Sequence, residues 1–181
     1  MNNLPVRRAA VLLAAAALAF TAQPALAAFG EASAQVWVAR SQKIAEAVGR
    51  PVTMTGDMAE NERVGKAYFD EVKAACSGIT GEHIRYGGKN MPVWAQTAQQ
   101  KFCVGADQMA AAYKNAEKDK GYCRDLKAVA GYASKAKRGE DPDAVVDAAK
   151  TLTDAAQKLM DSKIVLERWS VLGTRQIIFS C

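Results

Sequence analysis

Four cysteines constrain the fold of this chain most strongly, because they occur in even number in a sequence that begins with an export signal. An even count in an exported protein is typical of disulfide bonds, which form in oxidising compartments. No two of these cysteines have the short spacing of a C-x-x-C redox motif or of paired zinc ligands. We therefore expect a small domain held by two disulfides, with no metal bound by these cysteines.

The N-terminal residues 1–27 have the parts of a secretory signal peptide. Two arginines precede an uncharged apolar segment at 9–20, and Ala25 and Ala27 are small residues that suit signal peptidase. The apolar segment is shorter than the about 20 residues that a membrane-spanning helix needs. We therefore predict cleavage after Ala27 and no stable membrane insertion. The mature chain, residues 28–181, is expected in the periplasm or outside the cell.

The mature chain has the length of one domain and is long enough to bury a hydrophobic core. The formal net charge of the whole chain is +5, and two of its arginines leave with the signal. Basic and acidic residues are interleaved, as in Lys118-Asp119-Lys120, which is typical of solvated helix faces. We therefore expect neither a nucleic-acid partner nor a role at a membrane surface, and the oligomeric state stays open.

Apolar residues recur every three or four positions over most of the mature chain, which indicates amphipathic helices. The stripe from Trp94 to Ala116 is the clearest and predicts a core helix. Asp141 is expected to cap the last helix, and Pro142 suits its first turn. The expected helices cover 31–48, about 57–76, 92 to about 118, a segment that ends at Gly139, and a segment that begins at Asp141. The predicted fold class is all-α, a disulfide-stabilised bundle of about five helices in a single domain.

Residues 163–181 follow no single period, so the sequence allows a helix or a β-hairpin there. The Gly-Thr pair at 173–174 could form a two-residue hairpin turn, because β-branched and aromatic residues flank it. We favour a helix that continues to about Leu172, followed by an extended tail. The apolar residues 177–179 are expected to dock on the bundle, anchored by Cys181.

Helix geometry ranks the three pairings that four cysteines allow. Cys103 lies about 15 residues before the predicted end of its helix, or about 22 Å at a rise of about 1.5 Å per residue. Cys123 lies just beyond that end, and a disulfide needs Cα atoms within about 7 Å, so these two are the least favoured partners. The preferred pattern joins Cys76 to Cys103 and Cys123 to Cys181, although the sequence leaves the connectivity open.

Residues 77–91 form the most loop-like internal segment, because they contain several glycines and few apolar residues. His83 is the only histidine of the chain, and a lone loop histidine is more typical of a solvated side chain than of a general base. Arg85, Tyr86 and Lys89 combine charge, an aromatic ring and adaptable backbone. We interpret these three residues and His83 as a binding site for another envelope protein.

The motifs of catalytic and cofactor sites are missing from the sequence. It contains no G-x-S-x-G elbow, no S-x-x-K motif and no complete phosphate-binding loop. Met54 and Met58 have no neighbouring histidine or thiolate that would complete a copper site. The three tryptophans, Trp37, Trp94 and Trp169, are expected to fill the core rather than to line a ligand pocket. We therefore predict a protein that is not an enzyme and that has no cofactor.

The segment Phe102-Cys103-Val104-Gly105, followed by Cys123 and a terminal cysteine, resembles the Tai/Rap family of periplasmic immunity proteins. Those proteins are small, exported, helical and disulfide-bonded, and they neutralise peptidoglycan amidases delivered by type VI secretion. The sequence departs from the family pattern at Ala106, where a tyrosine is common, after Cys123, where C-x-P is absent, and at Ser180, which replaces a proline. The resemblance covers at most residues 76–181 and implies an immunity protein or inhibitor of a cell-wall hydrolase.

Two functions of different class follow as expectations. The first is a non-catalytic secreted or periplasmic protein that acts by protein–protein binding, with inhibition of a cell-wall hydrolase as its particular form. The second is an accessory structural component of an envelope or conjugative secretion system, in which helix faces make the contacts. An enzyme would require carboxylates that folding brings together in a cleft.

Overall fold

The computed structural model describes residues 29–79, 91–117 and 120–181. Within them the chain forms five helices and one β-hairpin, which confirms the mostly helical fold. The predicted signal peptide lies outside the described residues, so its cleavage stays a prediction. The elements are α1 (Glu31–Gly49), α2 (Met58–Ala75), α4 (Val93–Asn115), α5 (Gly121–Ala133), α6 (Asp143–Asp161), β1 (Ile164–Ser170) and β2 (Gly173–Phe179).

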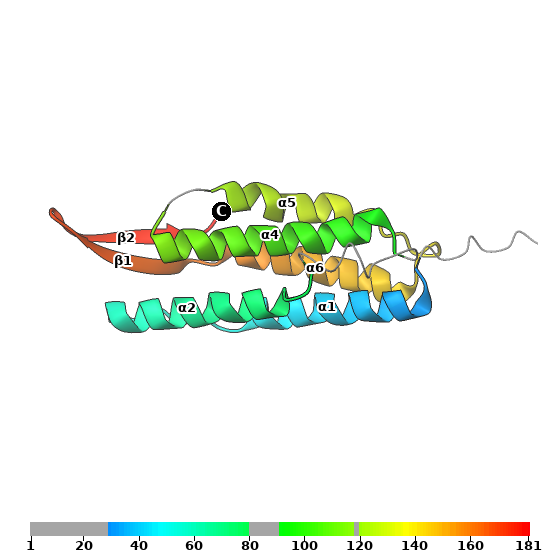
Figure 1. Ribbon diagram of the computed structural model, residues 1–181, viewed down its shortest axis with the longest axis horizontal. Coiled ribbons are helices and arrows are strands. Elements are labelled where there is room, and N and C mark those ends of the chain that lie inside the picture. Colours follow the sequence, from blue (N-terminus) through cyan, green and yellow to red (C-terminus); the bar gives the residue numbers. More distant parts are fainter. Residues whose placement is uncertain (1–28, 80–90, 118–119) are drawn as a thin grey trace, which may run out of the picture.

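The described part of the chain is elongated, and its two halves are built differently (Figure 1). In one half, α1 and α6 pack against each other beside α4 and α5. In the other half, α2 follows on from α1 and packs against β1, which follows on from α6. The long helix α4 runs through both halves. The hairpin therefore takes the place that a fourth helix would occupy in a regular bundle.

Two helix ends have a clear local cause, a side-chain cap on α2 and a left-handed residue after α4. The Asp57 carboxylate accepts hydrogen bonds from the backbone N–H groups of Ala59 (2.8 Å) and Glu60 (3.2 Å), so Asp57 caps α2; the sequence allowed either Thr55 or Asp57 in this role. α4 ends at Asn115, because Ala116 adopts a left-handed conformation with φ of 55°. This end comes a few residues before the one that the apolar pattern predicts.

Two predictions about the segment between α5 and α6 are wrong. α5 ends at Ala133, not at Gly139. Asp141 does not cap α6, because its carboxylate accepts a hydrogen bond from the backbone N–H of Lys137 (3.0 Å). Pro142 occupies the N-cap position of α6 and makes no side-chain hydrogen bond. The physical reason is local competition, since a short acidic side chain can satisfy the backbone of its own turn as well as a helix end.

The C-terminal segment is a β-hairpin, so the favoured helical continuation to Leu172 is wrong and the alternative is confirmed. Ile164 pairs with Phe179, and Leu166 pairs with Ile177, in an antiparallel register. All four side chains are buried on one face of the hairpin. This burial follows the period of two that a strand requires, and a helix would have carried these residues to different sides.

Both disulfides have the preferred pairing. Cys76–Cys103 joins the end of α2 to α4 with a Cα–Cα distance of 5.5 Å, and Cys123–Cys181 joins α5 to the last residue with 5.6 Å. The backbone N–H of Cys181 also donates a hydrogen bond to the carbonyl of Met160 (2.8 Å). The chain therefore ends docked on the helices, as the apolar C-terminal residues predict.

The tryptophans have two different environments. Trp37 is fully buried, its indole N–H donates to the Ala95 carbonyl (2.9 Å), and its ring lies edge to face with that of Trp94 (5.7 Å between centroids). Phe29 completes this aromatic cluster between α1 and α4. Trp169 is 75 % exposed, so the expectation that it fills the core is wrong.

Reduction of the disulfides is expected to lower the melting temperature, because each crosslink restricts the unfolded chain. Cys123–Cys181 spans 58 residues and Cys76–Cys103 spans 27, so chain entropy gives the longer crosslink an advantage of about 0.7 kcal/mol. Thermal unfolding of the two double cysteine-to-alanine variants, with and without reductant, measures both contributions. An unchanged melt of the reduced wild type would contradict the structural role of the disulfides.

Gly105 and Gly131 provide a matched test of the contact between α4 and α5. A Cβ at Gly105 would lie 2.8 Å from Cγ of Leu126, whereas one at Gly131 would meet no atom within 4 Å. Gly131→Ala is expected to stabilise the protein by up to about 1 kcal/mol, because alanine is the better helix former. Gly105→Ala is expected to destabilise it by about 1–3 kcal/mol through overpacking. Urea unfolding measures both, and equal stabilisation would mean that α4 and α5 are not closely packed.

Candidate functional site

The binding site predicted from the sequence consists of His83, Arg85, Tyr86 and Lys89. These residues lie in the segment 80–90, outside the described residues, so this site stays a prediction. Ile79 and Met91, on either side of the segment, are both buried. Two other candidate sites lie on the surface of the described part of the chain.

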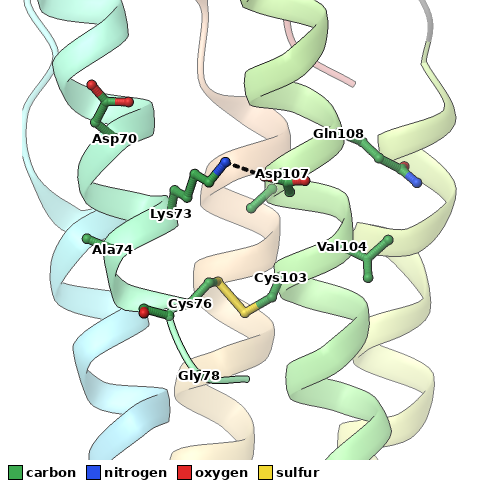
Figure 2. A pocket seen from close by; sticks show the side chains of 11 residues that line it. Asp70, Lys73, Ala74, Cys76, Gly78, Cys103, Val104, Asp107 and Gln108 are labelled. Atoms are coloured by element: carbon green, nitrogen blue, oxygen red, sulfur yellow. Dashed lines mark ion pairs between the residues drawn. A yellow bond between two sulfur atoms is a disulfide. The ribbon is translucent and has the colours of Figure 1, made fainter. Parts of the chain in front are cut away.

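A surface hollow of about 850 Å³ lies between α2 and α4 (Figure 2). Lys73 of α2 reaches across it, with Nζ 3.2 Å from Oδ1 of Asp107 on α4. Both side chains are more than half exposed, so this ion pair contributes little to stability. The Asp70 side chain is directed away from Asp107 in Figure 2. These two carboxylates therefore do not form the facing pair that an acid–base mechanism would need.

The free end of the hairpin is the second surface feature, and it projects beyond the ends of α2 and α4 (Figure 1). Val171 and Leu172 are fully exposed, and Trp169 is 75 % exposed. Six large apolar residues are exposed in the described part of the chain, and four of them, these three and Ile178, belong to the hairpin. Scattered exposed apolar residues are ordinary, but a group at one projecting point is typical of an interaction site.

The hairpin turn contains residues that turns rarely use. Val171 and Leu172 form it, and neither has a positive φ, whereas Gly173 follows with φ of 113°. Gly, Asn and Asp dominate such turns because they tolerate left-handed backbone or form local hydrogen bonds. Here Ser170 supplies the local hydrogen bond, since its hydroxyl donates to the Gly173 carbonyl (2.8 Å). Formation of the turn therefore does not require valine and leucine at its tip.

One face of the projecting half carries two arginines. Leu166 and Ile177 are the last buried pair before the turn. Two pairs closer to the turn, Arg168 lies opposite Arg175. This pair is on the same face as Leu166 and Ile177, because side chains alternate along a strand. Like charges directly opposite each other destabilise a hairpin. Neither arginine has a carboxylate within ion-pair distance among the described residues, although the charge of Arg168 acts on the Tyr113 hydroxyl of the neighbouring α4.

The other face of the projecting half is different in charge and shape. Trp169 lies on it, opposite Thr174. Two pairs closer to the bundle, on the same face, the side-chain amide of Gln176 donates a hydrogen bond to Glu167 Oε1 (2.7 Å). Ile178, half exposed, continues this face toward the base of the hairpin. The hairpin thus presents an aromatic and acidic face on one side and a cationic face on the other.

Aromatic packing fixes the base of the hairpin. The ring of Tyr113 on α4 lies 5.2 Å from that of Phe69 on α2 and 5.0 Å from that of Phe179 on β2. The Tyr113 hydroxyl donates to the Asn61 carbonyl (3.2 Å). A Cβ at Gly65 would overlap this hydroxyl, so the close approach of Tyr113 requires glycine there. The exposed tip therefore stands on a base that several elements hold in place.

Comparison with known proteins does not assign this site. No family model, curated protein or solved structure matches the chain. In residues 29–79, 91–117 and 120–181, no cluster of three histidine, cysteine or carboxylate residues could hold a metal ion. None of the helices in those ranges combines the length and the apolar character of a membrane span.

Sequence reasoning missed the hairpin tip. The segment from Trp169 to Gly173 contains the signal, since apolar residues there occupy the turn if the hairpin alternative is chosen. If a helix is favoured instead, the same residues are counted as part of that helix. A turn made of Val and Leu is uncommon enough to indicate a contact surface once the hairpin is accepted.

The buried tyrosines predict a loss of stability at high pH. Burial raises the pKa of Tyr68 and of Tyr113 to about 12; at Tyr113 the negative charge of Glu62 adds to this effect, and the positive charge of Arg168 opposes it. An unfolded tyrosine ionises near about pH 10. The stabilisation from keeping these hydroxyls neutral is thus fully present below about pH 10 and is lost as the pH rises to about 12.

Ultraviolet titration of tyrosinate, with urea unfolding at each pH, tests this expectation. Tyr68 and Tyr113 should ionise late in the folded protein and normally in urea. Tyr113→Phe should remove one late step and cost about 1 kcal/mol, because the hydrogen bond to Asn61 is lost. Normal ionisation of every tyrosine in a fully helical protein would show that Tyr113 is not buried.

Proposed function

We propose that this chain is a non-catalytic exported protein that acts by binding another protein of the cell envelope, with the hairpin tip as the contact. The observation that supports the proposal is the group of exposed Trp169, Val171 and Leu172 at a projecting turn. Tryptophan and arginine are enriched among the residues that dominate binding energy, and both occur in the projecting half of the hairpin. Two disulfides agree with an oxidising compartment.

Rigidity of the base favours binding. Tyr113 and Phe179 hold β2 against the helices, and Cys123–Cys181 closes the end of the chain. A contact surface that is ordered before binding loses less conformational entropy when the complex forms. The fold therefore supports a preformed binding element more readily than a surface that must first be ordered.

An inhibitor or immunity protein against a cell-wall hydrolase is the form of this function that the sequence resemblance suggests. A hairpin that projects from one end of the molecule has a shape suited to entering an enzyme cleft. The second candidate, an accessory component of a secretion system, would use helix faces. Val36 and Val93 are the only large apolar residues exposed on helices of the described part, so the hairpin carries the stronger argument.

The test is a pull-down from native periplasmic extract with the mature, oxidised protein as bait. The tip variant Val171→Ser/Leu172→Ser should lose a stoichiometric partner that the wild type retains. Val93→Ser is the matched control, because Val93 is also an exposed apolar residue, with 78 % of its surface exposed. It begins α4, at the opposite end of the molecule from the hairpin tip (Figure 1). Circular dichroism should show the same fold for all three.

A further variant with alanine at His83, Arg85, Tyr86 and Lys89 separates the two predicted sites. Loss of the partner only in this variant would move the contact from the hairpin to that segment. Absence of any partner would contradict the proposed function. If the partner is an enzyme, assay of its activity with added bait decides whether binding inhibits it.

A further inference from the structure

We infer that the partner offers the hairpin a cleft with an apolar floor and a wall that carries a carboxylate facing Arg168 and Arg175. This inference rests on the proposed function and specifies the chemistry of the partner's site. It starts from two features of the hairpin that do not stabilise the free protein: the exposed apolar tip and the two opposed arginines, which have no carboxylate within ion-pair distance among the described residues.

The apolar tip accounts for the floor of the cleft. Val171 and Leu172 are fully exposed, and Trp169 lies directly behind them on one face. Water contact with these side chains is unfavourable, and an apolar surface would remove it. A polar floor would bury the same side chains without that gain and would leave its own polar groups unpaired.

The arginine pair accounts for the wall. Arg168 and Arg175 face each other across the strands and repel each other in the free protein. A carboxylate placed between two guanidinium groups would accept hydrogen bonds from both and remove the repulsion. One acidic residue of the partner can therefore contact both guanidinium groups and offset part of their positive charge.

The shape of the hairpin favours a cleft over a flat surface. The last buried pair, Leu166 and Ile177, lies about four residues from the turn, so about 13 Å of the hairpin is free at about 3.3 Å per residue. Arg168 is three residues before Val171, which places it about 10 Å behind the tip. A flat partner would touch the tip and leave the arginines in water. A cleft of this depth reaches both.

The two unlike faces favour a protein over a lipid surface. Arg168 and Arg175 lie on one face, and Glu167 lies on the other. An anionic membrane would surround an inserted hairpin with the same charge on all sides, and this charge would repel Glu167 while it attracts the arginines. A protein cleft has two walls that can differ in charge. The carboxylate wall is thus expected only on the arginine side.

Arg175→Glu is the decisive variant, because it is expected to have opposite effects on folding and on binding. The new carboxylate would face Arg168 and replace a repulsive pair by an attractive one, so the melting temperature should stay the same or rise. Binding to the partner should weaken by about 30-fold or more, because the partner's carboxylate would meet a like charge. A merely structural role of Arg175 would change both quantities in the same direction.

The measurement is the dissociation constant of the partner retained in the pull-down, for wild type and variants at two salt concentrations. Lys127→Glu, an equal charge change at an exposed position of α5, is the matched control and should alter affinity by less than about three-fold. A photo-crosslinking amino acid at Leu172 then locates the cleft in the partner. Replacing the acidic residue nearest the cross-link with lysine should restore binding of the Arg175→Glu variant.

Three outcomes would overturn the inference, and they can be told apart. A partner that binds Arg175→Glu as tightly as wild type leaves the proposed function intact but removes the carboxylate wall. Cosedimentation of the wild type with phosphatidylglycerol vesicles, lost in Val171→Ser/Leu172→Ser, would show that the tip binds lipid. Absence of any partner would remove the proposed function together with the inference. Capture of a protein without this charge dependence does not support the inference.

Discussion

The packing of Tyr113 against the hairpin is the contact on which one half of the molecule depends. Its ring lies against Phe69 of α2 and Phe179 of β2, and its hydroxyl reaches the backbone of Asn61. One side chain of α4 therefore joins the two elements that replace α1 and α6 in this half. Gly65 makes this approach possible, because a Cβ at this position would overlap the Tyr113 hydroxyl. The choice of glycine at this position therefore contributes directly to the packing of Tyr113.

The helices and disulfides were predictable because both follow from short-range rules. A period of about 3.6 residues marks a buried helix face wherever the helix is long, as in α4, and Asp57 is a recognisable cap. The length of one helix and the reach of a disulfide argued against a Cys103–Cys123 bond, and the observed Cys76–Cys103 bond belongs to the preferred pattern of the two that remained. The end of α5 was not predictable in this way, since Asp141 can serve its own turn or the next helix equally well.

The hairpin was harder to predict because its apolar residues serve two purposes. Ile164, Leu166, Ile177 and Phe179 alternate and are buried, which is the pattern of a strand. Trp169, Val171 and Leu172 interrupt that alternation with apolar side chains that lie in water. An apolar pattern predicts burial, and it therefore favours a helix to about Leu172 and places Trp169 in the core. The error in fold and the missed site have the same cause.

A projecting two-stranded hairpin is marginal by itself, so its base must supply the order that its tip lacks. Cys123–Cys181 and the hydrogen bond from Cys181 to Met160 prevent β2 from fraying at the end of the chain. With the base fixed, the tip can keep exposed apolar side chains and two opposed arginines at a small cost to the whole fold. Selection for stability alone would favour polar turn residues and an oppositely charged pair. The hairpin is firmly anchored, yet its free end has neither polar residues at the turn nor an oppositely charged pair. This is the physical reason to regard the free end as a binding surface.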